Sequence, residues 1–150
     1  MLDPSPSLQT AFGFWPSKVL LIAVDFGVFT HLGGGRKTGV ELGAELGLHP
    51  RAIYDFFDAL VAMKFLDRAG DGPEAFYLNT PTGALYLDAN SPRYVGGILV
   101  MLNARLFKFW HDLPEALKTG HPQNEAKHGQ EGVFEELYAH YPDLSNSPVR

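Results

Sequence analysis

The chain has 150 residues, no cysteine and a formal net charge of −5, and 45% of its residues are apolar. That apolar share is enough to build a core, which argues against general disorder, and the missing cysteines exclude disulfides and thiolate chemistry. The negative charge disfavours nucleic acids and anionic membranes as partners, because both recruit basic surface.

The first predicted helix begins at Pro16 and ends near Phe26. Proline is tolerated in the first turn of a helix, because the N–H it lacks would have no partner there. The segment from Val19 to Val24 is apolar on almost every side, so this helix must be buried on most of its surface. The apolar run stops at Asp25, far too early to cross a membrane, and no signal-peptide pattern precedes it. We therefore expect a cytoplasmic protein.

A helix–turn–helix pattern follows between residues 38 and 64. Thr38 and Glu41 have the spacing of a capping box, in which each side chain accepts a hydrogen bond from the other residue's backbone N–H. Residues 48–50 mark a turn, and apolar residues then recur with the helical period: Ile53, Phe56, Phe57, Leu60 and Val61. Two short strands, residues 65–68 and 75–78, flank a turn sequence and complete a winged-helix pattern.

The charges on this pattern do not suit a DNA reader. The helix that would enter a DNA groove carries Asp55 and Asp58 on its exposed side, against Arg51 and Lys64. The hairpin carries one basic and three acidic residues: Arg68, Asp67, Asp71 and Glu74. DNA-binding proteins gain much of their affinity from basic side chains on phosphates, so we predict no nucleic-acid binding and a winged helix used for assembly.

The second half of the chain contains further predicted helices. Thr80 begins a short helix that ends at Leu87, and a helix that is again almost wholly apolar follows residues 91–92. Helix continues over residues 106–117, with a break near Pro114, and ends at Gly120. Residues 121–132 are expected to form a loop and residues 133–141 a short amphipathic helix. We predict one mostly α winged-helix dimerisation domain over residues 1–141, with a small β-hairpin wing and extra dimerisation helices. A polar tail, residues 142–150, would begin a linker.

Two helices that are apolar on nearly every side are hard to bury within so small a chain. Burying one leucine or isoleucine stabilises by about 1.5–3 kcal/mol, so leaving such surfaces in water would be costly. We therefore predict an intertwined homodimer. Its interface would use residues of both helices: Leu20, Ile22, Val24, Ile98, Leu99 and Leu102.

No residue pattern indicates catalysis, a metal or a cofactor. The glycines at 33–35 precede Arg36, where a phosphate-binding loop needs glycine before lysine, and the preceding segment is predicted to be helix. We interpret this segment as a connector. The histidines lack a two-histidine metal spacing on a helix. His111 and Asp112 are adjacent helical residues, which do not face each other, so they are not expected to act as a catalytic pair.

Two aromatic groups leave alternatives open. Phe107 and Trp110 are three residues apart and share a helical face, where they either pack in a core or form a wall for a flat apolar small molecule. The N-terminal group around Phe12 and Trp15 leaves the same two alternatives, and packing against a partner chain is a third.

The order and spacing of these segments resemble one known family. The matching segments are residues 25–29 (DFGVF), 38–48 (TGVELGAELGL), 77–80 (YLNT) and 109–113 (FWHDL). Over roughly residues 8–141 the chain resembles the N-terminal dimerisation domain of class I S-adenosylmethionine-dependent O-methyltransferases, which include caffeate, hydroxyindole and bacterial polyketide-tailoring enzymes.

The resemblance implies an interlocked dimer that closes over the substrate pocket of a C-terminal Rossmann-like domain. It also implies that Trp110 and Phe107 lie near an aromatic substrate, and that Phe12 and Trp15 belong to a segment reaching the partner's pocket. The cofactor motif and the catalytic histidine would follow residue 150, so we expect this chain alone to bind no S-adenosylmethionine and to be inactive. Two alternatives remain: a ligand-responsive winged-helix transcriptional regulator, and a stand-alone dimeric small-molecule binder.

Overall fold

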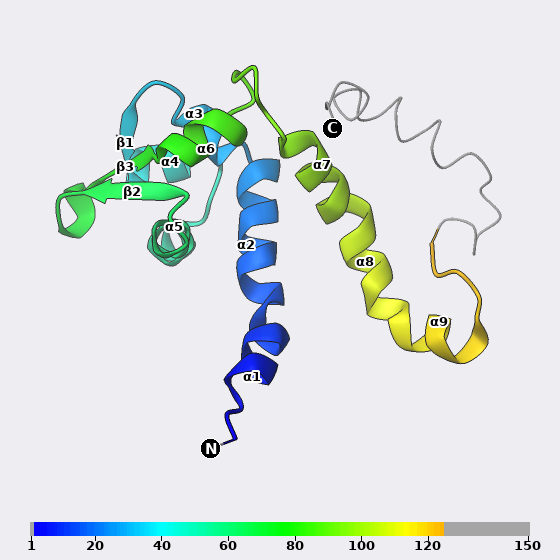
Figure 1. Cartoon of the computed structure of the whole chain (residues 1–150). Coiled ribbons are helices and arrows are strands. Elements are labelled where there is room, and N and C mark those ends of the chain that lie inside the picture. The colour runs from blue at the N-terminus through cyan, green and yellow to red at the C-terminus, as the bar shows by residue number, and fades with distance from the viewer. Residues whose placement is uncertain (1, 125–150) are drawn as a thin grey trace. The chain divides into compact units, whose positions relative to one another are not determined.

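The computed structural model describes residues 2–124 and separates the chain into two compact units, residues 1–96 and 97–150 (Figure 1). The described part is mostly helical and holds a small three-stranded antiparallel sheet, which confirms the predicted class at that level. The predicted helix over residues 133–141 and the tail over residues 142–150 lie outside the described residues.

Three helices open the first unit: α1 (Ser5–Phe12), α2 (Phe14–Asp25) and α3 (Val28–His31). Helix α1 was not expected from its proline- and serine-rich sequence. The Asp3 carboxylate accepts hydrogen bonds from the backbone N–H of Ser5 at 2.9 Å and from its hydroxyl at 2.7 Å, which supports the start of this helix. Gly27 adopts a left-handed conformation, with φ of 70°, and separates α2 from α3.

The predicted capping box begins helix α4 (Gly39–Glu45). The backbone N–H of Glu41 donates to the Thr38 hydroxyl at 3.3 Å, and that of Thr38 donates to the Glu41 carboxylate at 2.8 Å. After a single 3-10 turn, η1 (Pro50–Ala52), helix α5 (Ile53–Ala62) follows. The predicted capping box and the predicted helix after the turn are both confirmed. Both could be predicted because caps and helical periodicity are encoded by residues close in sequence.

The sheet has the strand order β1-β3-β2, with β1 (Arg36–Thr38), β2 (Leu66–Ala69) and β3 (Phe76–Asn79). The hairpin β2–β3 was predicted, with each strand shifted by one residue. Strand β1 was not, because three residues are too few to show an alternating pattern. It pairs antiparallel to β3, with Arg36 opposite Leu78. A 3-10 turn, η2 (Gly72–Glu74), lies in the hairpin loop. Helix α6 (Pro81–Tyr86) follows with Thr80 as its predicted cap.

The core of the first unit lies between the sheet and helices α2 to α6. Its largest fully buried side chains come from the sheet, from α3 and the residue that follows it, and from α4 and α5: Tyr77, Phe29, Phe57, Leu32, Leu42, Leu60, Leu66 and Val28. Helix α2 contributes Leu21, Ala23 and Val24 and packs against α3 and α5. One side of this helix is therefore covered within its own chain.

The described part of the second unit is one irregular helical run that ends at Thr119. Helix α7 (Gly96–Met101) leads into a π-helical turn, η3 (Leu102–Leu106), and then into α8 (Phe107–Phe109). A 3-10 turn, η4 (Trp110–Asp112), precedes α9 (Leu113–Thr119), which ends at Gly120 with φ of 69°. The helix break predicted near Pro114 is this 3-10 turn, which lies one turn earlier because Pro114 is in the first turn of α9. Within residues 2–124, every helix is too short or too polar to cross a membrane.

Candidate functional site: exposed apolar helices

Helices α1 and α2 expose a group of aromatic side chains at their junction. The rings of Phe12 and Trp15 are stacked, with centroids 5.0 Å apart and planes within 5° of each other. Phe14 lies against Trp15 with a tilted ring at 5.2 Å. All three side chains are exposed, Trp15 by 58%, and α1 buries none of its residues. These three side chains therefore form an exposed aromatic cluster at the junction of α1 and α2.

The residues of α2 predicted to form a dimer interface divide between two environments. Leu20 and Ile22 are half-buried, whereas Val24 is only 5% exposed and lies in the core of its own chain. The helical period explains the division, because residues 21 and 24 are three apart and share the buried side of α2, which packs against α3 and α5. Leu20 and Ile22 are thus the predicted interface residues of α2 that keep exposed surface for a contact with another molecule.

The second unit also exposes apolar side chains along its helical run. Ile98 is exposed, and Leu99 and Leu102 are half-buried. Phe107 is half-buried, and Trp110 is 66% exposed at the start of the 3-10 turn. The two aromatic pairs predicted to bind a ligand belong to different units, with Phe12 and Trp15 in the first and Phe107 and Trp110 in the second.

Sequence reasoning missed a polar network that links α5 to the hairpin. The Tyr77 hydroxyl donates to the Asp58 carboxylate at 2.7 Å, and the Arg68 guanidinium donates to the same carboxylate at 3.1 Å. Arg68 also donates to the Gly72 carbonyl at 3.1 Å and lies over the Tyr77 ring, 5.7 Å from its centroid. The only basic residue of the hairpin is thus engaged within the chain, which lowers its availability for a phosphate.

The chain matches one known protein family over more than half of its length. The family model described as "O-methyltransferase dimerisation domain" matches residues 8–89. The chain belongs to this family. The resemblance inferred from the order of the sequence segments is therefore confirmed.

Similar proteins cover the dimerisation domain and extend well beyond it. The "Tetracenomycin polyketide synthesis 8-O-methyl transferase TcmO" of Streptomyces glaucescens is 39% identical over 131 residues, which are 87% of this chain and 38% of that protein. The "N,N-dimethyltransferase OxyT" of Streptomyces rimosus is 33% identical over 138 residues, 91% of this chain and 38% of that protein. The chain thus spans about two fifths of the length of these relatives.

Among solved structures, the dimerisation domain is similar to human N-acetylserotonin methyltransferase in complex with SAM. The TM-score is 0.79 at 27% sequence identity, and the match covers 92% of this chain and 42% of that chain. The backbone arrangement described here therefore recurs in a methyltransferase of known structure.

The glycines at 33–35 differ in their place in the fold from a glycine-rich turn that binds S-adenosylmethionine. The Rossmann-like class binds such a cofactor at a glycine-rich turn that follows a strand and opens a helix, with an acidic residue on the ribose. Here Gly33, Gly34 and Gly35 follow helix α3 and precede strand β1, so they connect two elements in the opposite order. For metals, residues 2–124 contain no group of three suitable side chains.

The Tyr77 network leads to a prediction about alkaline pH. Burial raises the pKa of the Tyr77 hydroxyl above its ordinary value of 10.0, and its hydrogen bond to the Asp58 carboxylate raises the pKa further. Above about pH 10 the unfolded chain therefore loses this proton before the folded chain does, and the stabilisation present below pH 10 is progressively lost. We expect Tyr77→Phe to flatten the fall in melting temperature between about pH 9 and pH 11.

The matched control is Tyr86→Phe, because Tyr86 is exposed on α6. This variant should keep the alkaline fall of the parent chain. At neutral pH, Tyr77→Phe should cost about 1 kcal/mol for the lost hydrogen bond. Identical slopes for Tyr77→Phe and the parent chain would show that this tyrosine does not control the alkaline transition.

Proposed function

We propose that this chain is the dimerisation and substrate-lid domain of an S-adenosylmethionine-dependent O-methyltransferase that acts on a small aromatic or polyketide-type molecule. The chain belongs to the dimerisation-domain family and spans about two fifths of relatives that are methyltransferases. The 39% identity with an 8-O-methyl transferase favours oxygen over nitrogen as the methyl acceptor. In this proposal the catalytic domain is not part of residues 1–150, and the cofactor binds there.

The elements between residues 38 and 79 are proposed to form a winged helix that serves assembly. Helix α4, the turn before α5 and the hairpin β2–β3 occur in the order of that motif. Asp55 is exposed on α5, and Arg68 in the hairpin is held by Asp58 and by the Gly72 carbonyl. This surface has few free cations for phosphate contacts, which supports assembly over DNA recognition.

The observation that carries the proposal is the apolar surface of α1, α2 and the second unit. An obligate dimer interface resembles a protein core cut in half, and these helices expose side chains typical of a core. The proposed interface includes Leu20 and Ile22 on α2 and three residues of the second unit: Ile98, Leu99 and Leu102. Val24 supports α2 from inside its own chain.

The lid function is proposed for the exposed aromatic residues. Trp110 and the stacked pair of Phe12 and Trp15 are exposed, and Phe107 lies one helical turn before Trp110. Aromatic faces pack well against flat apolar molecules, so Phe107 and Trp110 would line the substrate pocket of a catalytic domain, and Phe12 and Trp15 would reach the pocket of the partner chain. The same side chains would keep water away from the reacting groups.

Light scattering on the purified chain tests the assembly role. We expect a mass of twice the 16.5 kDa of one chain at micromolar concentration, because monomers would leave the apolar helices in water. A well-behaved monomer at tens of micromolar would contradict the proposed dimer.

Calorimetric titration with S-adenosylmethionine tests whether the cofactor binds outside this chain, in the proposed catalytic domain. We expect no heat of binding from this chain, since the glycines at 33–35 do not follow a strand. Binding with a dissociation constant of about 1–10 μM, an affinity near 8 kcal/mol, would overturn this part of the proposal.

A further inference from the structure

The loop of the β2–β3 hairpin contains an aspartate followed by a glycine, Asp71 and Gly72. No other Asp–Gly or Asn–Gly pair occurs in the 150 residues. Asp71 is exposed, and its side chain does not cap the 3-10 turn η2 that follows it. A methyl group built at Gly72 would meet no atom within 4 Å, so the space around this backbone is open. The Asp71 carboxyl group is therefore free to approach the backbone nitrogen of Gly72.

This pair of residues allows a reaction between the backbone and its own side chain. The Gly72 nitrogen attacks Cγ of the protonated Asp71 carboxyl group; a C–N bond forms, a C–O bond breaks, and the amide proton and the hydroxyl group leave as water. Glycine favours the attack because it has no Cβ to obstruct it and rotates freely. Water then opens the resulting succinimide ring. Opening at the former peptide carbonyl gives an isoaspartyl bond, in which the chain passes through Cβ, with no net change in mass or oxidation state.

The folded hairpin holds Asp71 away from the geometry of this ring. The ring needs the Asp71 Cβ and the Gly72 nitrogen in one plane with the Cα–C bond between them, whereas the observed ψ of 161° holds the nitrogen out of that plane. Rotation into the plane displaces Gly72. The Gly72 carbonyl oxygen accepts hydrogen bonds from Arg68 Nη2 at 3.1 Å and from the Ala75 N–H at 3.3 Å. Local opening of the loop strains these bonds, so they restrain the reaction.

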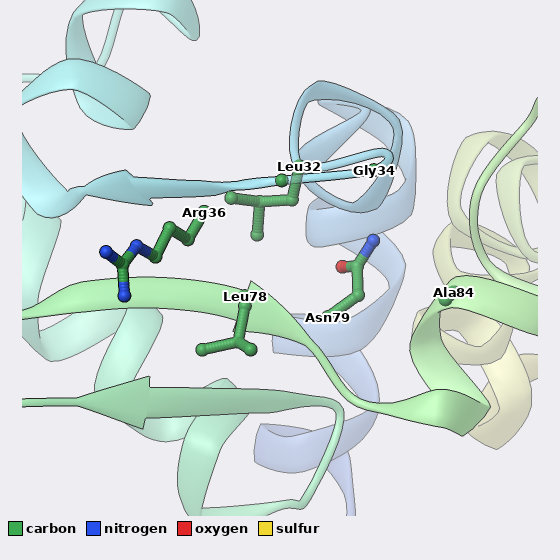
Figure 2. A pocket seen from close by; sticks show the side chains of 7 residues that line it. Leu32, Gly34, Arg36, Leu78, Asn79 and Ala84 are labelled. Carbon is green, nitrogen blue, oxygen red and sulfur yellow. The ribbon is translucent and has the colours of Figure 1, made fainter.

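Arg68 is fixed on the inner face of the sheet, whereas Arg36 lies on the outer face. Arg68 is opposite Tyr77, which is fully buried, and its guanidinium also donates to the Asp58 carboxylate. Arg36 is opposite Leu78, beside an open cleft of about 440 Å³ (Figure 2). Successive residues of β3 point to opposite faces, and so do the arginines opposite them. Arg68 is thus the arginine of the sheet that ties the hairpin loop to α5.

We propose that Asp71 is a site of isoaspartate formation and that the hydrogen bond from Arg68 to the Gly72 carbonyl restrains this modification. The isoaspartyl bond lengthens the loop by one methylene group and displaces Gly72 from Arg68. The modified hairpin then loses this link to α5. The modification needs only water and is independent of the proposed methyltransferase role.

Peptide mapping of the purified chain, after several weeks at body temperature and mildly acidic pH, tests the site. Mild acid is used because the protonated carboxyl group is the form that loses water. We expect the peptide with Asp71 to separate into two forms of equal mass, and electron-transfer fragmentation to locate isoaspartate at position 71. Asp55 is the internal reference, because it is exposed but lies in α5 and is followed by Phe56. No more isoaspartate at position 71 than at position 55 would overturn the proposal.

Two variants test the restraint by Arg68. Arg68→Met removes the donor to the Gly72 carbonyl and should speed isoaspartate formation about fivefold, the effect of one lost hydrogen bond on local opening. Tyr77→Phe is the matched control, because it also removes a partner of Asp58 but leaves the bond from Arg68 to Gly72 in place. This control should react at the rate of the parent chain. Equal acceleration in both variants, or an unchanged rate in Arg68→Met, would refute the restraint.

Discussion

Replacing Ile98 with aspartate is expected to convert the proposed dimer into monomers. Ile98 lies in the first turn of α7 and is 44% exposed. An acidic residue is well tolerated in the first turn of a helix, so the single chain should still fold. Burying its unpaired charge against a partner would cost about 3–5 kcal/mol, which weakens association roughly a hundredfold or more. Light scattering across a dilution series measures this change.

The matched control is Val40→Asp. Val40 lies in the first turn of α4, is 57% exposed and is not part of the proposed interface. Its substitution adds the same charge at an equivalent helical position, so the chain should remain dimeric. If both variants dissociate, net charge rather than a specific interface controls assembly. If Ile98→Asp remains a dimer, Ile98 lies outside the interface.

Gly83→Ala is expected to destabilise the first unit strongly. A methyl group at this position of α6 would lie 2.5 Å from the Phe65 carbonyl oxygen and 3.4 Å from the Phe29 ring. That carbonyl oxygen already accepts hydrogen bonds from the Thr80 N–H and hydroxyl, so it cannot move away freely. Alanine favours helix over glycine by about 1 kcal/mol, but overpacking against a fixed backbone costs about 1–3 kcal/mol or more. We expect a net loss of about 2 kcal/mol and a melting temperature lower by roughly 4–8 °C.

Gly35→Ala provides the comparison for this effect. No neighbouring atom lies within 4 Å of a methyl group built at Gly35, and its backbone is not left-handed. Its melting temperature should stay close to that of the parent chain. A Gly83→Ala variant as stable as Gly35→Ala would show that α6 can shift away from strand β2 at little cost.

The sequence predicted the elements whose signals lie within one or two helical turns. The Thr38 capping box, the periodic apolar residues of α5 and the Thr80 cap are all found in the structure. These features depend on contacts between residues three or four apart, which sequence spacing reports directly. The hairpin was predicted for the same reason, because its turn is local.

Elements that depend on distant partners were not predictable in this way. Strand β1 is stabilised by pairing with β3, whose residues are about forty positions later in the chain. Asp58 was predicted to lie on a solvated acidic face, whereas Tyr77 and Arg68 from the hairpin bind its carboxylate. Neither partner can be found from local spacing, since strand register decides which side chains meet α5.

The apolar helix α2 shows the same division between local and tertiary information. The sequence by itself determined that this helix is apolar on almost every side and needs to be covered. Only the tertiary structure decided that Val24 is covered by its own chain, whereas Leu20 and Ile22 remain half-buried. The physical reason is that the hydrophobic effect has no direction. The composition of α2 therefore predicts how much apolar surface is buried, whereas packing against α3 and α5 decides which side of the helix is buried within its own chain.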